Sequence, residues 1–142
     1  MSKVAIVFWS GTGNTQAMAA YVAQGVQSAG EEADTYTSAE FDAAKAAEYD
    51  KIAFGCPSMG VEQLEETEFQ PMWDEVKGVL GGKKIVLFGS YGWGSGEWMD
   101  TWRDEASTCG CSMPAEPVIC NATPDAEGGA QCEVLGKALA EA

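Results

Sequence analysis

Short apolar runs alternate along the chain with longer segments in which apolar residues recur every three or four positions. The runs are typical of buried β-strands, and the segments between them are typical of amphipathic helices. The predicted strands cover residues 4–8, 33–37, 51–56, 83–89 and 117–121. Because helical segments separate the strands, we expect an α/β fold: one doubly wound, five-stranded parallel sheet with helices on both faces.

The segments between the strands predict about five helices. Those with the clearest bounds cover residues 14–29, 69–80 and 96–109. A last helix is expected to begin near Thr123 and Pro124, because threonine can cap a helix and proline fits its first turn. Gly128 and Gly129 are expected to delay that helix. No linker or repeat interrupts the pattern, so residues 1–142 are predicted to form a single domain.

Charge narrows the classes of possible partner. The chain carries 22 acidic residues, eight basic residues and no histidine, which gives a net charge of −14. A surface this negative repels nucleic acid and anionic lipid and attracts proteins with basic surfaces, although solubility alone would also explain the acidity. The lack of histidine excludes Ser-His-Asp and Cys-His nucleophilic sites.

The N-terminal residues and the cysteines bear on location. Residues 1–8 are typical of a strand and not of a signal peptide, and no apolar run is long enough for a membrane span, so a cytoplasmic protein is expected. The cysteines stand at positions 56, 109, 111, 120 and 132. Cys109 and Cys111 could form a redox pair or a metal clip, but we expect all five to be reduced thiols that partly belong to the core.

Three loops that follow predicted strands are rich in glycine, small polar and aromatic residues. They are Ser10-Gly11-Thr12-Gly13-Asn14-Thr15, Pro57-Ser58-Met59-Gly60-Val61-Glu62 and Ser90-Tyr91-Gly92-Trp93-Gly94. The first, third and fourth predicted strands lead into them. Ligands of such sheets bind beyond the carboxyl ends of the strands, so the three loops are expected to form one site.

The first loop has the composition of an anion site. Glycines let backbone N–H groups turn inward, hydroxyls can donate hydrogen bonds, and the following helix adds positive potential at its N-terminus. No lysine follows Gly13, as it would in a nucleotide P-loop, and the third glycine of G-x-G-x-x-G is missing. A monophosphate ester is therefore the expected ligand, and the alternative is an ordinary strand–helix turn.

Tryptophans occur in two different settings. Trp93 stands between two glycines, where it has few local packing partners, so we expect it to cover a flat ring system by stacking. Trp98 and Trp102 stand at helical spacing and are expected in the core instead.

At these three loops the sequence resembles the flavodoxin family, and the resemblance extends over essentially the whole chain. It is nearest to the short, low-potential flavodoxins of anaerobic bacteria. The first loop is similar to the family's phosphate loop, Met59-Gly60-x-Glu62 to its redox-responsive turn, and residues 89–94 to its outer flavin loop. The resemblance implies non-covalently bound FMN and the strand order 2-1-3-4-5.

The resemblance implies roles at both ends of the cofactor. The hydroxyls of Ser10, Thr12 and Thr15, with the backbone N–H groups of their loop, would hold the phosphate. Trp93 would stack on the outer face of the flavin and Met59 would pack on its inner face.

The edge of the flavin ring has its own implied contacts. Glu62 would accept a hydrogen bond from the imide N–H, and backbone groups of Gly92 and Trp93 would reach the pyrimidine oxygens. On reduction the Gly60–Val61 peptide would turn over, so that the carbonyl of Gly60 accepts from the newly protonated flavin N5.

Two positions depart from the family's pattern. Pro57 stands where close relatives carry a hydroxyl residue, so one phosphate hydrogen bond is either missing or supplied by Ser58. Val61 stands where relatives carry a small or polar residue. A type II turn would need a positive φ at Val61, which β-branching makes costly, and we expect a penalty of about 1 kcal/mol to the semiquinone-stabilising turn.

The implied function is that of a monomeric, low-potential one-electron carrier and not of an enzyme. It would shuttle between semiquinone and hydroquinone and donate electrons to ferredoxin-dependent oxidoreductases with basic surfaces. Acidic residues crowd the second loop, and we expect them to disfavour the flavin anion: Glu62, Glu65, Glu66 and Glu68. The alternative is an FMN-dependent NAD(P)H quinone or nitro reductase, which would need room for a nicotinamide beside the flavin.

Overall fold

A computed structural model of the chain describes residues 3–11, 13–59, 64–92 and 96–142. Its strands form one sheet in the order β2-β1-β3-β4-β5, and all neighbours are parallel. The strands are β1 (Lys3–Phe8), β2 (Glu32–Thr37), β3 (Lys51–Gly55), β4 (Lys84–Tyr91) and β5 (Val118–Asn121). The predicted doubly wound sheet and its implied strand order are confirmed.

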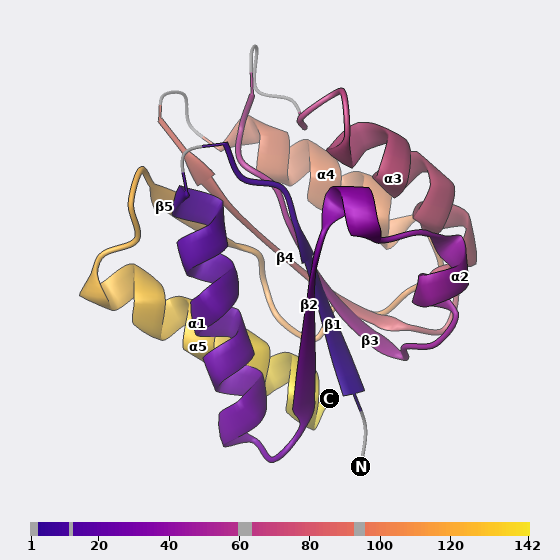
Figure 1. Ribbon diagram of the computed structural model, residues 1–142, viewed down its shortest axis with the longest axis horizontal. Helices are drawn as coiled ribbons and strands as arrows, with labels where there is room; N and C mark the ends of the chain where they lie inside the picture. Colours follow the sequence, from indigo (N-terminus) through magenta and orange to yellow (C-terminus); the bar gives the residue numbers. More distant parts are fainter. Residues whose placement is uncertain (1–2, 12, 60–63, 93–95) are drawn as a thin grey trace.

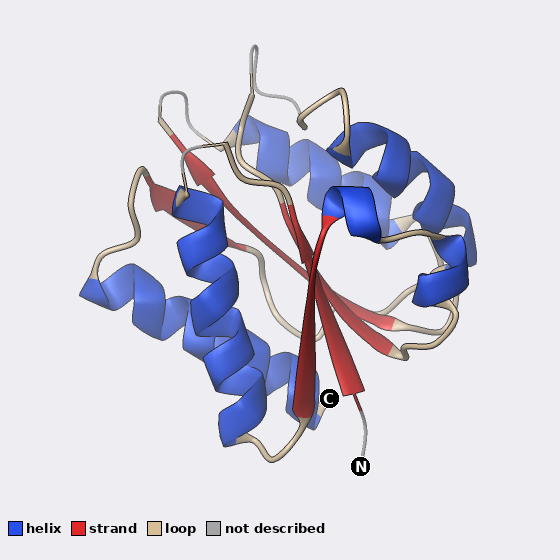
Figure 2. Ribbon diagram, viewed as in Figure 1, coloured by secondary structure: helices blue, strands red, loops and turns tan. Residues whose placement is uncertain are grey.

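Helices cover both faces of the sheet, as Figures 1 and 2 show. One face carries α1 (Asn14–Ser28) and α5 (Ala126–Glu141), and the other carries α2 (Ala43–Ala46), α3 (Phe69–Val76) and α4 (Glu97–Ser107). Two short 3₁₀ helices, η1 (Ser38–Glu40) and η2 (Lys77–Val79), follow β2 and α3. The helix predicted over residues 69–80 is therefore an α-helix to Val76 that tightens into a 3₁₀ turn.

Each face of the sheet has its own core. The side chains of a strand alternate between the two faces, so Val4 and Ile6 of β1 pack under α1 and α5, while Ala5 and Val7 pack under α3 and α4. This burial on both faces explains why β1 is a continuous apolar run. The second of these cores is rich in aromatic rings. It contains Phe54, Phe69, Trp73, Trp98 and Trp102, which confirms that Trp98 and Trp102 are core residues.

The start of α5 differs from the prediction. The capping residue is Asp125 and not Thr123: its side chain accepts from Gly128 N–H at 2.7 Å. Gly128 and Gly129 do not delay the helix, because they lie inside it and are buried. A Cβ at Gly129 would lie 2.7 Å from the ring of Tyr21 in α1, so this glycine is needed for close packing.

Two further glycines bring α1 and α5 into backbone contact. A Cβ at Gly25 would lie 1.9 Å from the carbonyl oxygen of Glu133, and one at Gly136 would lie 2.1 Å from that of Val22. Neither position tolerates a side chain without movement of a helix, so the pair is locked together.

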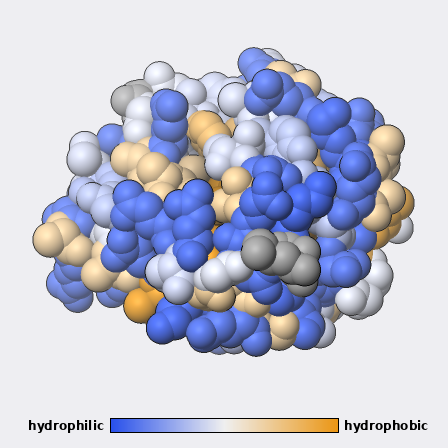
Figure 3. Space-filling view, turned by 60° about the horizontal axis from the view of Figure 1, so that its bottom comes forward, coloured by the Kyte–Doolittle hydropathy of each residue, from blue (hydrophilic) through white to orange (hydrophobic). Residues whose placement is uncertain are grey.

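Hydrophilic residues dominate the face of the molecule where the strands begin, with apolar residues scattered among them (Figure 3). Both chain ends lie on this side (Figure 1). Within the described ranges, no helix has the length and apolar composition that a membrane span requires.

Candidate functional site

The three predicted loops leave neighbouring strands at the carboxyl edge of the sheet. β1, β3 and β4 lie side by side; the first loop follows β1, the second follows β3, and the third begins within the end of β4. Backbone hydrogen bonds join the second loop to the third and the residues that lead into the first and second: Ser58 N–H donates to Ser90 O at 3.0 Å, and Trp9 N–H donates to Gly55 O at 3.1 Å. The described parts of all three loops therefore meet at one edge.

Part of the predicted set lies outside the described ranges. These residues are Thr12, Gly60, Val61, Glu62, Trp93 and Gly94. The stacking role of Trp93, the imide contact of Glu62 and the turn hypothesis for Val61 therefore stay predictions.

Ser10 organises the first loop through its hydroxyl oxygen. That oxygen accepts from Gly13 N–H at 3.0 Å and from Gln16 N–H at 3.3 Å. A serine hydroxyl has two lone pairs and one proton. Both lone pairs are engaged within the loop, so the proton is the part of the hydroxyl that can serve a ligand.

The N-terminus of α1 is prepared for an anion. Gly13 occupies the N-cap position with a φ of 94°, a left-handed conformation that favours glycine, and the first turn holds no acidic residue. Ala17 N–H donates to Gly13 O at 3.0 Å, whereas Asn14 and Thr15 have N–H groups that helix geometry leaves without an acceptor. These groups and the helix dipole favour negative charge.

Thr15 adds a buried hydroxyl to this end of α1. The residue is 1% exposed, and its Oγ1 has no hydrogen-bond partner among the described residues. Burying an unpaired hydroxyl costs on the order of 1–3 kcal/mol. A phosphate oxygen at the helix N-terminus would be the missing acceptor, so the residues present fit the phosphate monoester expected from the sequence.

A fourth loop, after β5, supports the first. The Thr123 hydroxyl donates to Asn14 Oδ1 at 3.0 Å across 109 positions of sequence. In the same loop Ala122 has a φ of 55°. Its N–H donates to Tyr91 O at 2.8 Å, and its carbonyl accepts from the Ser90 hydroxyl at 2.7 Å. Sequence reasoning did not include Thr123 or Ala122 in the site, and nothing in their local pattern reveals these long-range contacts.

The predicted residues of the third loop divide by environment. Ser90 is 3% exposed, and both its hydroxyl and its carbonyl are used inside the protein. Tyr91 is half-buried, with its ring in tilted contact with Trp98 at 5.8 Å between centroids. Gly92 is exposed, and nothing lies within 4 Å of a Cβ built there. Ser90 and Tyr91 thus pin the loop, while Gly92 offers an open backbone.

The second loop starts at a fully buried cysteine. Cys56 N–H donates to Phe88 O at 3.1 Å, and its carbonyl accepts from Trp98 Nε1 at 3.2 Å. Pro57, Ser58 and Met59 follow and are all half-buried. Ser58 is fixed through its backbone N–H, which donates to Ser90 O. That its hydroxyl supplies the phosphate hydrogen bond that Pro57 cannot make stays a prediction.

Glu65, predicted to add to a negative field, has its carboxylate turned to the start of α3. One oxygen accepts from Glu68 N–H at 2.7 Å and Phe69 N–H at 2.9 Å. The other accepts from the backbone N–H of Thr67 at 3.0 Å and from its hydroxyl. Burial raises the pKa of Glu65, but these hydrogen bonds outweigh burial and hold the pKa below its ordinary value. Glu66 and Glu68 are exposed.

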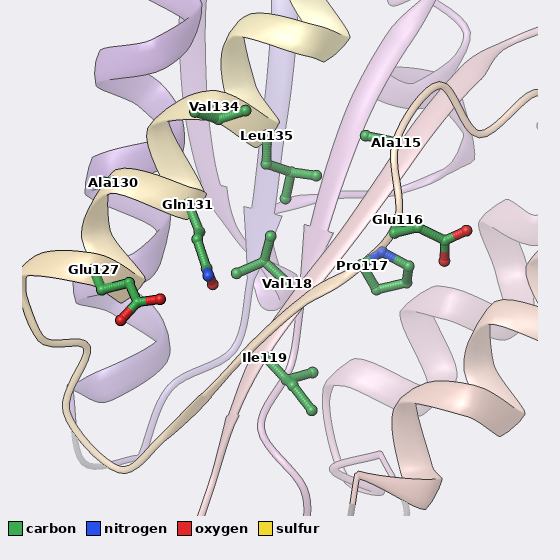
Figure 4. Close-up of a pocket in the computed structure, with 10 residues that line it drawn as sticks. All are labelled: Ala115, Glu116, Pro117, Val118, Ile119, Glu127, Ala130, Gln131, Val134 and Leu135. Atoms are coloured by element: carbon green, nitrogen blue, oxygen red, sulfur yellow. The ribbon is translucent and has the colours of Figure 1, made fainter.

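One hollow lies at the carboxyl edge of the sheet, and a larger one lies beside the edge strand β5. One of about 280 Å³ adjoins Ser10, and its lining includes Trp9 and Gln16. Another of about 650 Å³ lies between β5 and α5, where Val118 and Leu135 point toward one another while Glu116 and Ile119 point away from α5 (Figure 4). None of the predicted site residues lines the larger hollow.

The described residues contain no cluster of three or more side chains able to hold a metal ion. All five cysteines are unpaired, as predicted, and Cys56, Cys120 and Cys132 are buried. Burial raises the pKa of the thiols, to about 12 at Cys132, so they are protonated at neutral pH.

The sequence and the structure of the chain are similar to those of known flavodoxins. The family model described as Flavodoxin matches residues 6–134. A flavodoxin of Megasphaera elsdenii is 41% identical over 98% of this chain and 99% of its own length, and one of Clostridium beijerinckii is 39% identical over 95% and 97%. The solution structure of the two-electron reduced Megasphaera elsdenii flavodoxin superposes with a TM-score of 0.91 at 42% identity, covering 98% of this chain and 99% of that one.

Proposed function

Because the chain belongs to the flavodoxin family, whose members bind FMN and carry electrons, we propose that it is a low-potential one-electron carrier. FMN is held non-covalently at the three loops of the carboxyl edge. When bound, FMN supplies reversible one-electron chemistry that no side chain of the protein offers. The protein's own contribution is to bind, orient and electrostatically tune that group.

The observation that carries this proposal is the N-terminus of α1. It joins a glycine N-cap, an acid-free first turn and the buried hydroxyl of Thr15, which has no hydrogen-bond partner in the described part of the chain. The Ser10 hydroxyl has a proton left to donate, and the backbone N–H groups of Asn14 and Thr15 point out of the first turn. Together they form a donor set for one phosphate, and the sequences of the three loops contain no lysine or arginine.

The second and third loops would hold the ring of the cofactor. Met59 and the open backbone of Gly92 lie at the ends of neighbouring strands, which supports contacts on one face and one edge of the ring. Trp93 and Glu62 are proposed for the other face and the imide edge, on the strength of the family resemblance. Ser90 and Tyr91 hold the third loop in place.

The low reduction potential proposed for bound FMN follows from the negative charge of the protein. The protein carries −14, and Glu66 and Glu68 are exposed close to the second loop. A negative field disfavours further negative charge on the ring and lowers the potential at which the last electron is accepted. The same field favours redox partners with basic surfaces, such as ferredoxin-dependent oxidoreductases, in the cytoplasm, where the unpaired thiols stay reduced.

A titration of the flavin-free protein tests the phosphate part of this proposal. We expect FMN to bind and riboflavin, which is the same ring without a phosphate, to bind at least about tenfold more weakly. Equal affinities for the two flavins would contradict the phosphate assignment, and failure to bind FMN would overturn the proposal as a whole.

Electron delivery provides the second arm of the test. The FMN-loaded, chemically reduced protein should reduce a basic ferredoxin-dependent enzyme at a rate that falls as salt screens the opposite charges. Steady oxidation of NAD(P)H with a quinone by the purified protein would favour the reductase alternative instead, which the family assignment does not support.

A further inference from the structure

The two ends of the second loop are joined by a contact that the flavin-binding roles do not require. Glu65 N–H donates to the thiol sulfur of Cys56 at 3.4 Å. Cys56 directly follows β3 and is 0% exposed, while Glu65 precedes α3 and is 5% exposed. Residues 57–64 lie between them in the chain, so this hydrogen bond closes the segment at its base.

Both partners are themselves fixed to the rest of the fold. The backbone of Cys56 is bonded on both sides, to Phe88 O and to Trp98 Nε1. The carboxylate of Glu65 is bonded to the first backbone N–H groups around the start of α3, and its carbonyl accepts from Gln70 N–H at 2.8 Å. The junction thus connects the end of β3, the end of β4 and the start of α3.

The steric surroundings of the junction leave little freedom. A Cβ at Gly89 would lie 2.2 Å from Cys56 O, so the backbone of β4 approaches as closely as a glycine permits. Leu64, just before Glu65, is 8% exposed and packs in the aromatic core. A thiol accepts only a weak hydrogen bond, but here it accepts in a site from which water is excluded.

We infer that Cys56 and Glu65 form a clasp that fixes the two ends of this segment, next to Pro57 and Leu64, relative to the ring of the cofactor, which makes both of them positioning residues. This inference rests on the proposed function. Holding the ends of an eight-residue segment together removes conformations that it would otherwise lose on binding, so part of the entropy cost is met during folding. The phosphate site at α1 lies on a different loop and should not depend on the clasp.

The test removes the acceptor without changing charge. Cys56→Ala deletes the sulfur, and Cys132→Ala is the matched control, because Cys132 is also 0% exposed but packs in the other core, under α1 and α5. The flavin-free forms of wild type and both variants are titrated with FMN and, separately, with inorganic phosphate. We expect Cys56→Ala to raise the Kd for FMN about three- to tenfold, as loss of one ordinary hydrogen bond predicts.

The phosphate titration distinguishes a local effect of Cys56→Ala on the second loop from a general loss of order in the protein. Cys56→Ala should leave the Kd for inorganic phosphate unchanged, and Cys132→Ala should leave both constants unchanged. Cys56→Ser restores an oxygen acceptor and should recover part of the FMN affinity. Equal FMN affinity in the two alanine variants would overturn the clasp, and so would a parallel loss of FMN and phosphate binding in Cys56→Ala.

Amide hydrogen exchange reads the clasp without any cofactor. In the flavin-free protein, the Glu65 amide should exchange at least about tenfold faster in Cys56→Ala than in Cys132→Ala once global stability is matched. Unchanged protection would contradict the clasp. If wild type binds no FMN, the proposed function fails by itself, and the exchange measurement still decides whether the two ends are joined.

Discussion

Two helices begin at the same edge of the sheet, and their N-termini are completed in opposite ways. α5 is capped by its own chain: Asp125 accepts from Gly128 N–H, and Glu127 adds a second acid to the first turn. α1 has a glycine at its N-cap and no acid in the first turn, and among the residues that the structure describes it is the neutral oxygen of Ser10 that reaches it. The contrast shows that sequence near a helix start determines whether its positive end is satisfied internally or left for a ligand.

The two helix starts are also connected. Thr123, just before α5, donates to Asn14, the first residue of α1. The loop that leads into α5 therefore holds the Asn14 side chain at the start of α1, whose N-cap residue Gly13 has no side chain of its own to cap the helix. Mutations that exchange the character of the two ends test this interpretation directly.

The largest effect is expected when α1 receives the carboxylate that α5 already has. Thr15→Asp places a negative charge at the predicted phosphate site, and like charges in contact cost several kcal/mol. FMN affinity should fall at least about a hundredfold in a fluorescence titration. Glu127→Gln, which removes an acid from the first turn of α5, serves as the control and should leave FMN affinity unchanged.

A smaller but more specific effect is expected from Thr15→Val, which keeps the shape and removes only the hydroxyl. FMN affinity should fall about ten- to hundredfold, as for loss of a hydrogen bond to a charged group. The flavin-free protein should be as stable as wild type or more so, because an unpaired buried hydroxyl has been removed. Loss of stability without loss of affinity would mean that this hydroxyl serves the fold.

The reverse pattern is expected at α5. Asp125→Ala removes the cap, and the free energy of unfolding should fall by about 1 kcal/mol in urea titrations. FMN affinity should not change, since the carboxylate serves only its own helix. A loss of affinity comparable to that of Thr15→Val would erase the distinction between the two helix starts.

The smallest effect concerns α3, where the carboxylate of Glu65, three residues before the N-cap residue Glu68, accepts from the N–H groups of Glu68 and Phe69 at the start of the helix. The pKa of Glu65 is lower in the folded protein than its ordinary value. Its contribution is therefore present above the ordinary carboxyl range and is lost as the pH falls through the folded pKa. Glu65→Gln should be less stable than wild type at pH 7, with the difference shrinking as the pH approaches 3. Exposed Glu66→Gln is the control, with no such convergence expected.

The sequence was most informative where one local property decides the structure. Continuous apolar runs such as β1 correctly predicted the buried strands. Glycines with hydroxyls predicted an anion site at α1, and the described start of that helix fits this prediction. The errors arose where a distant residue decides. Gly128 and Gly129 looked unfavourable for a helix, but Tyr21 of α1 leaves no room for a side chain at Gly129. The short helix α2 has too few residues to show a period.

The residues of the candidate site could be predicted from the sequence, but the contacts that hold those residues in place could not. The roles of Ser10 and Thr15 were predicted from the hydroxyls of the loop and from the family resemblance; they stay predictions, and the hydrogen-bonding states of the two residues fit them. Glu65 was read as one of several surface acids, because sequence does not show that its carboxylate turns back to α3. The contact between Cys56 and Glu65 and that between Thr123 and Asn14 depend on topology alone.

The glycine contacts between α1 and α5 limit which substitutions can be accepted at these positions during evolution. Because Gly25 and Gly136 press against the opposite backbone, a methyl group gained at either position moves a whole helix and not a side chain. The proposed anion site sits at the N-terminus of α1 and would move with that helix. A substitution of Gly25 or Gly136 would thus displace the proposed phosphate donors at the start of α1. We therefore expect natural sequences to vary as little at these two positions as in the three loops.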